Sequence, residues 1–263
     1  MFLPNVERKT DMTARDFSII ENDHLFFMNS ATEAQADRKS HLEELSRSFP
    51  EPRLLHWLDF GCSQGEFTTS LCSEWNWPSN QLCMSLLEPV AAHREVAIKT
   101  LSRFTKEPPR EIHDLKGEED ASYDVILANH SCYYVDDAEQ TLRELKRLLR
   151  PDGLGIVAIA GQNNFLIELW GIGFDSIGQT TPHWVAEDFK SAFHQQKIEF
   201  RTKLVPYEIR FADTPENIDR ILRFLFGENW PSVDANLLRS QFSEHRHGDD
   251  IHIETHCQHF IFS

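Results

Sequence analysis

The stretch from Leu54 to Glu66 constrains the fold more than any other part of the sequence. An apolar run there ends in the acid Asp59 and then breaks into a turn that holds Gly61 and Gly65. A buried strand that leads into a tight turn and then a helix is the opening unit of a nucleotide-binding α/β sheet. The spacing D-x-G-x-x-x-G differs from the G-x-G-x-x-G of dinucleotide sites. It therefore favours a ligand without a pyrophosphate.

A second apolar run begins about 22 residues after Asp59 and ends in Glu88. A carboxylate at the tip of a second strand can accept hydrogen bonds from both ribose hydroxyls of an adenosine. Further pieces follow in the order of such a sheet, and they are Leu87–Pro89, His113–Leu115 and Tyr123–Asn129. With Leu58–Gly65, these pieces resemble the class I S-adenosylmethionine-dependent methyltransferases over residues 54–161. Ser63 departs from that pattern, because the family usually carries a glycine there.

This resemblance implies a Rossmann-like, seven-stranded α/β sheet with helices on both faces and S-adenosylmethionine as cofactor. It also implies a set of cofactor-binding residues at the strand ends. These are Asp59, Gly61, Ser63, Gly65, Glu88, Pro89, His93, Asp114, Leu115, Asn129 and His130. From the residues alone, Asp114 is equally well explained as an ordinary loop acid.

The length of 263 residues fits one methyltransferase domain with insertions. We expect a helical lid over residues 1–50, a cofactor-binding core over 51–161, and substrate-side segments with the last strands over 162–263. Residues 1–15 are expected to fray, and apolar spacing predicts one or two helices from Asp16 to Phe49. Glycines among aromatics over 161–182 predict a mobile rim or short helix over a pocket.

The helices and strands after residue 180 are predicted from the spacing of apolar residues. A helix is expected to start within 181–184 and to run to about residue 195, and a strand is expected over 198–211. Helices are expected over 215–226 and 232–242, and a last strand over 251–262 with clear period-two alternation. Five histidines lie after residue 244. They could bind zinc, but their placement on two faces of a strand argues against it, so we predict no metal site.

Two polar residues stand out near the expected pocket. His130 follows the fourth strand, whose carboxyl end opens on the ligand crevice of such sheets. It could act in the reaction, or it could be a core histidine with its hydrogen bonds satisfied. Glu33 lies in the leader, the segment before the first strand that is expected to form the helical lid. There it could bind a substrate or only complement a helix dipole.

The charge and the cysteines limit the partners. The formal net charge is −16, which argues against nucleic acid because Lys and Arg supply most of that affinity. It suits a small cationic acceptor, although it could also serve solubility alone. Five scattered cysteines predict reduced thiols in a cytoplasmic protein, and no secretory or membrane-spanning run is visible. We expect a monomer or weak dimer.

The chain also resembles the histamine N-methyltransferase group, through Phe26–Glu33, Tyr133–Val135, Leu222–Leu225 and the last strand. In that group a leader glutamate holds the substrate ammonium, and Glu33 matches it. His130 and, approximately, His256 stand where the group has a glutamine and an asparagine, so histamine itself is in doubt. The expected substrate-binding residues are Glu33, His130, Tyr133, Tyr134, Trp170, Trp184 and His256.

Three functions are compatible with these patterns. The leading one is N-methylation of an amine or imidazole-type nitrogen, with His130 and Tyr133 as catalytic residues and His130 able to take a proton from an alkyl amine. The second is O- or C-methylation of a small metabolite. The third is a binding protein that has lost turnover, and the retained Gly61, Gly65 and Glu88 count against it.

Overall fold

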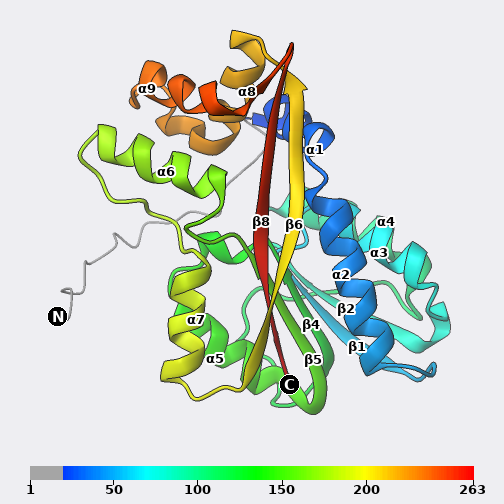
Figure 1. Cartoon of the computed structure of the whole chain (residues 1–263). Helices are drawn as coiled ribbons and strands as arrows, with labels where there is room; N and C mark the ends of the chain where they lie inside the picture. The colour runs from blue at the N-terminus through cyan, green and yellow to red at the C-terminus, as the bar shows by residue number, and fades with distance from the viewer. Residues whose placement is uncertain (1–19) are drawn as a thin grey trace.

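The structure, a computed structural model, describes residues 20–263 (Figure 1). The expected fraying of residues 1–15 and a helix start near Asp16 lie outside the described residues. The helices and strands are, in chain order, α1 (Glu21–Ser30), α2 (Glu33–Ser48), β1 (Leu55–Phe60), α3 (Glu66–Trp75), β2 (Leu82–Leu87), α4 (Ala91–Leu101), β3 (Arg110–Glu111), β4 (Tyr123–Asn129), α5 (Ala138–Leu148), β5 (Leu149–Ile159), α6 (Phe165–Ser176), α7 (Ala186–Gln195), β6 (Phe200–Ala212), α8 (Pro215–Phe226), α9 (Ala235–Ser240), β7 (Arg246–His247) and β8 (Asp250–Phe262).

One mixed sheet runs through the molecule in the order β3-β2-β1-β4-β5-β8-β6, and the short β7 pairs with β8. Strands β1 to β5 pair in parallel, whereas β8 is antiparallel to both β5 and β6. The expected Rossmann-like α/β sheet is therefore confirmed. Because β1 pairs with β2 on one side and β4 on the other, the strand order reverses there, and ligands bind at the carboxyl ends of such a reversal.

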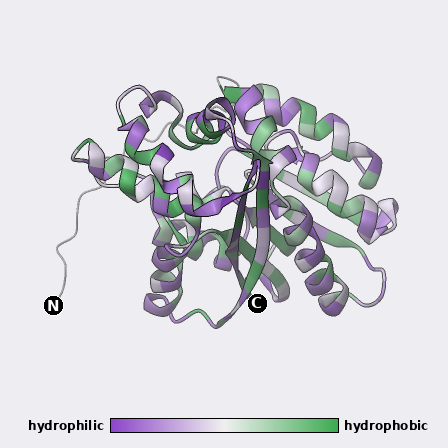
Figure 2. Cartoon of the chain, turned by 45° about the horizontal axis from the view of Figure 1, so that its top comes forward, coloured by the Kyte–Doolittle hydropathy of each residue, from purple (hydrophilic) through white to green (hydrophobic). Residues whose placement is uncertain are grey.

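Helices α2, α3 and α4 cover one face of the sheet, and α5 and α7 cover the other (Figure 1). Neighbouring strand residues alternate between two apolar cores. Trp57 and Leu127 pack with Leu45, Leu71 and other residues of the first helix layer, as the period of two requires. Leu58 belongs to the opposite core. Figure 2 shows hydrophilic and hydrophobic residues alternating along the helices, as expected for helices with one buried face.

Residues 161–182 contain a helix longer than expected. The sequence predicts a loop or short helix because of its glycines, but α6 has 12 residues. Asn164 caps it, because its Oδ1 accepts a hydrogen bond from the N–H of Leu166 at 2.9 Å. Gly173 is a packing residue, since a Cβ there would lie 2.3 Å from the Phe226 ring. The glycine thus allows a close helix contact and does not break the helix.

Other boundaries differ by a few residues. The helix expected to start within 181–184 begins at Ala186, and the one expected over 232–242 is the six-residue α9 followed by a 3₁₀ turn. The third strand is limited to Arg110–Glu111. None of the helices within residues 20–263 has the length and apolar character needed to span a membrane.

Helix α1 and the turn between α1 and α2 are fixed to the C-terminal part of the chain. Phe27 of α1 stacks on Phe224 of α8 with ring centroids 4.6 Å apart, and Asp23 accepts a hydrogen bond from Arg223 at 2.8 Å. Between α1 and α2, the N–H of Thr32 donates to the carbonyl of Glu208 in β6 at 2.9 Å. These contacts place the start of α2 over the carboxyl edge of the sheet.

Candidate functional site

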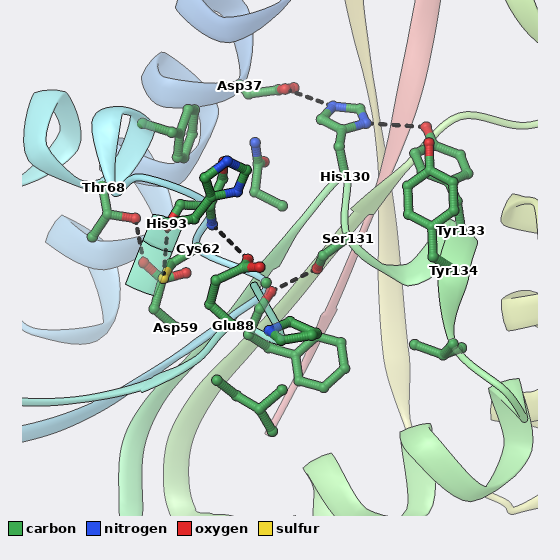
Figure 3. A pocket seen from close by; sticks show the side chains of 18 of the residues that line it. Asp37, Asp59, Cys62, Thr68, Glu88, His93, His130, Ser131, Tyr133 and Tyr134 are labelled. Carbon is green, nitrogen blue, oxygen red and sulfur yellow. Dashed lines mark hydrogen bonds and ion pairs between the residues drawn. The ribbon is translucent and has the colours of Figure 1, made fainter. Parts of the chain in front are cut away.

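A cavity of about 940 Å³ opens at the carboxyl ends of β1, β2 and β4 (Figure 3). Its volume is near the top of the range of about 300–1,000 Å³ for ligand pockets, so it has room for a cofactor and a second molecule. The loops after the three strands line one part of it. The start of α2, the segment after β4 and α6 line the other part. We name these parts the cofactor half and the acceptor half.

The turn after β1 forms one wall of the cofactor half. Gly61, Ser63 and Gly65 all have positive φ, at 75°, 47° and 78°. A Cβ on Gly61 would lie 2.3 Å from the Cβ of Ser131, so this glycine is required by space as well as by backbone conformation. Ser63 adopts a left-handed backbone conformation, which is costly for any residue other than glycine. It keeps the turn that a glycine would form there.

Glu88 stands at the end of β2 with its carboxylate in the cavity (Figure 3). Its Oε2 accepts a hydrogen bond from the N–H of Ser63 and its Oε1 accepts one from the N–H of Val90, each at 2.9 Å. A carboxylate oxygen can accept two hydrogen bonds, so each retains capacity for a ligand hydroxyl. Pro89 and His93 line the cavity beside it.

Asp59 closes β1 and lines the cavity, but its carboxylate also serves the protein. The Thr68 hydroxyl donates to Asp59 Oδ2 at 2.6 Å. Burial, with a smaller contribution from the charge of Glu88, raises the pKa of Asp59 to about 7 despite that hydrogen bond. Asp59 is therefore poised between its neutral and charged forms near physiological pH.

Asp114, Leu115, Asn129 and His130 also line the cavity. Gly65 does not, because it packs closely against Ala97 and Leu101 of α4. Asp114 accepts a hydrogen bond from the N–H of Gly117 at 2.9 Å, and Leu115 is buried beside it. The side-chain carbonyl oxygen of Asn129 is buried and has no hydrogen-bond partner among residues 20–263. A buried acceptor without a partner is costly, so Asn129 is suited to receive a donor from a ligand.

The acceptor half brings together Glu33, His130, Tyr133, Tyr134 and Trp170. Two other predicted substrate residues do not line it. The indole N–H of Trp184 donates to the carbonyl of Val135 at 2.7 Å and so supports the loop after β4. His256 lies on β8, where its carbonyl accepts a hydrogen bond from Asn164 at 2.9 Å. Neither side chain is among the described residues that face the cavity, so their predicted role is not supported by their positions.

His130 has a left-handed backbone, with φ at 52°, which turns its ring from the end of β4 toward α2. Its Nε2 lies 2.9 Å from Asp37 Oδ2 and 3.8 Å from Glu33 Oε1, and its Nδ1 lies 3.0 Å from the Tyr133 hydroxyl. Burial lowers the pKa of His130, but the two carboxylates outweigh burial and raise it to about 9. At neutral pH the ring is an imidazolium, so it cannot serve as the expected general base in this state.

Tyr133 also differs from its expected role. Its hydroxyl oxygen accepts a hydrogen bond from the N–H of Ala160 at 2.7 Å. Burial and the charge of Glu33 raise the pKa of Tyr133 well above 10. The side chain is therefore a neutral phenol that orients His130 and lines the wall, and it does not supply a phenolate.

Three further residues contribute to the acceptor half and were not expected there from the sequence. They are Asp37, His259 and Tyr207. Asp37 is fully buried on α2, and His259 Nε2 lies 2.8 Å from its Oδ1. A signal was present, because polar residues recur along one face of α2 at helical spacing. They are Glu33, Asp37, Ser40, His41 and Glu44. A polar helix face that is buried indicates a functional or specific polar network.

The comparisons with known proteins agree with this geometry. A family described as "Methyltransferase domain" matches residues 31–200. The chain belongs to this methyltransferase family. A curated relative, the malonyl-[acyl-carrier protein] O-methyltransferase of Paenibacillus sp. (strain JDR-2), is 28% identical over 137 residues, which are 49% of this chain and 46% of that protein. The chain therefore spans about half the length of the curated relative it matches.

Solved structures share the methyltransferase fold at low sequence identity. One is a protein from Galdieria sulphuraria with a provisional assignment as a sarcosine dimethylglycine methyltransferase. Its TM-score is 0.54 at 14% identity, over 86% of this chain and 84% of that chain. A possible histamine N-methyltransferase of Thermotoga maritima has a TM-score of 0.51 at 16% identity, over 94% and 97%. These similarities show a class I methyltransferase fold.

The cofactor half fits S-adenosylmethionine, the cofactor of class I methyltransferases. Glu88 would hold the ribose hydroxyls, because its oxygens retain acceptor capacity in the cavity. Asp114 and Leu115 would border the adenine, and the turn at Gly61 would lie along the amino-acid part. Asn129 would supply an acceptor that the protein itself leaves unpaired. When bound, the cofactor supplies an electrophilic methyl group on a sulfonium.

Proposed function

We propose that this methyltransferase methylates a nitrogen of a small cationic amine. The observation that carries the proposal is the carboxylate of Glu33 in the acceptor half. His130 lies 2.9 Å from Asp37 and 3.8 Å from Glu33, so the two carboxylates and the one imidazolium together leave one net negative charge for a ligand cation. A buried ammonium binds well only beside such an opposite charge.

Glu33 is also suited to accept a proton. Burial raises its pKa most, the charge of Asp37 adds to this, and His130 and a hydrogen bond from Tyr207 oppose it. The net effect is a raised pKa, which makes this carboxylate a better proton acceptor than an ordinary glutamate. In the proposed reaction an ammonium gives its proton to Glu33, and the freed nitrogen lone pair forms the N–C bond as the S–C bond breaks.

The rest of the acceptor half positions the amine. The rings of Tyr134 and Trp170 line the cavity, and Trp170 is fixed because its indole N–H donates to the carbonyl of Leu225 at 3.0 Å. Aromatic faces bind cations by about 0.5–2 kcal/mol. Holding two reactants in line can lower a barrier by roughly 7 kcal/mol or more. The resemblance to the histamine N-methyltransferase group, in which Glu33 matches the ammonium-binding glutamate, supports the same class of acceptor.

The test uses the purified protein, S-adenosylmethionine and a panel of primary amines, secondary amines and imidazoles, with methylated products measured by mass spectrometry. Glu33→Gln should lower kcat/KM for the best amine at least tenfold and leave cofactor affinity unchanged. Glu43→Gln is the matched control, because Glu43 lies on the same helix, is exposed and pairs with Lys203. Absence of product from every amine, or equal activity of Glu33→Gln and wild type, would reject the proposal.

A second candidate is O-methylation of a carboxylic acid. It is favoured by the 28% identity to the malonyl-[acyl-carrier protein] O-methyltransferase. A substrate carboxylate would meet Glu33, and the cationic ring of His130 is already paired with Asp37. The same assay with a malonyl thioester separates the two candidates, because O-methylation should not require Glu33.

A further inference from the structure

A continuous chain of hydrogen bonds crosses the molecule behind the acceptor half. It begins at the Ser40 hydroxyl, 3.1 Å from His259 Nδ1, and His259 Nε2 lies 2.8 Å from Asp37 Oδ1. Asp37 Oδ2 lies 2.9 Å from His130 Nε2, and His130 Nδ1 lies 3.0 Å from the Tyr133 hydroxyl. The last two links are drawn in Figure 3. The chain therefore joins α2, β8 and the segment after β4.

Asp37 is the centre of this chain, and although it borders the cavity, protein groups contact both of its carboxylate oxygens. Its side chain is fully buried, and the thiol of Cys257 donates to Oδ1 at 3.1 Å. His259 contacts the same oxygen, whereas His130 contacts Oδ2. Glu33 lies four residues earlier on the same helix and still lines the cavity. Two carboxylates at this spacing repel each other. The ring of His130 lies closer to Asp37 than to Glu33, at 2.9 Å against 3.8 Å.

We propose that Asp37, supported by His259, is a positioning residue that draws the cationic ring of His130 away from Glu33 and so keeps the Glu33 carboxylate open to the methyl acceptor. The proposal rests on the function proposed above. Without the charge at position 37, Glu33 becomes the nearest carboxylate for the ring, at a distance of 3.8 Å that a small ring rotation can close. The ring would then occupy the place of the substrate cation.

The groups around His130 support this assignment. The titratable side chains near it come from α2, the segment after β4, β6 and β8, and they are Glu33, Asp37, His41, Tyr133, Tyr207, Cys257 and His259. Burial and the neighbouring His259 lower the pKa of His41 to about 3, so His41 brings no charge at neutral pH. Glu33 and Asp37 are therefore the two groups that compete for the ring.

The experiment compares Asp37→Asn with wild type by NMR of histidine-labelled protein, cofactor titration and amine kinetics. In wild type, His130 should keep its proton through pH 8. In Asp37→Asn, the titration of His130 should move down by at least one pH unit. KM for the amine should rise about tenfold, which corresponds to ~1.4 kcal/mol, with a smaller change in kcat. The Kd for S-adenosylmethionine should stay within a factor of three, which shows that the variant folds.

Further variants keep the test decisive. His259→Gln retains the charge of Asp37 but removes its support, and it should raise KM by a smaller factor in the same direction. Asp152→Asn, at an exposed position near the start of β5, is the matched control and should behave as wild type. An unchanged His130 titration and unchanged KM in a cofactor-binding Asp37→Asn variant would overturn the inference. If no amine is methylated by wild type, the proposed function fails, whereas the NMR titration still decides whether Asp37 holds His130.

Discussion

Replacement of Glu88 by alanine should weaken cofactor binding more than any other single change in the cofactor half. Glu88 has one hydrogen bond from a backbone N–H on each oxygen, and each oxygen can accept one more from a ribose hydroxyl. A hydrogen bond to a charged group contributes about 1.5–3 kcal/mol. Loss of two corresponds to roughly 3–6 kcal/mol, and the Kd should rise by about 10²- to 10⁴-fold.

Isothermal titration with S-adenosylmethionine and S-adenosylhomocysteine measures this change. Glu88→Gln should give an intermediate loss, because its amide group keeps one acceptor but turns a donor toward a backbone N–H. Glu95→Ala is the control, since Glu95 is exposed on α4 and does not line the cavity. A Kd for Glu88→Ala within threefold of wild type would refute the assignment of the ribose to this carboxylate.

Two further predictions concern stability. Gly61→Ala should lower the free energy of unfolding by about 2–4 kcal/mol, because it adds a clash with Ser131 to backbone strain. Gly248→Ala, with φ at 65° and open space around it, should cost only the strain, and equal losses in urea unfolding would contradict the clash. Because the folded-state pKa of His130 is raised from 6.5 to about 9, its stabilisation is complete below pH 6.5 and is lost as the pH rises through 9. Urea unfolding should show a loss of up to about 3 kcal/mol across that range, and this loss should be absent in His130→Gln.

The positions of the cofactor-half residues could be predicted because they depend on local sequence patterns. Asp59, Glu88 and Asn129 lie at or just after the carboxyl ends of β1, β2 and β4 in a contiguous part of the chain, so the strand-turn-helix order alone could place them. The glycines of α6 led to the prediction of a loop or short helix. Gly173 instead allows a close contact with Phe226, which only the folded structure reveals.

The acceptor half could be predicted only in part. Glu33 and His130 were found, but the sequence gives no local sign that Asp37 meets His259, which is 222 residues away. Without knowledge of its contact with Asp37, His130 is predicted to be able to accept a proton. His256 was assigned from the resemblance, and Trp184 as an aromatic face for a cation. The direction of their side chains, in a loop and on the interior strand β8, depends on packing that a single sequence does not show.

The position of β8 has a consequence for how the protein is made. This strand of 13 residues lies between β5 and β6, although it follows both in the chain. The strands and turns that surround the cofactor come from a contiguous stretch that leaves the ribosome early. His259 arrives only with β8, and until then β5 has an unpaired edge and Asp37 lacks one of its partners. If Asp37 has the positioning role proposed above, the nascent chain can assemble its cofactor pocket before its acceptor pocket is complete.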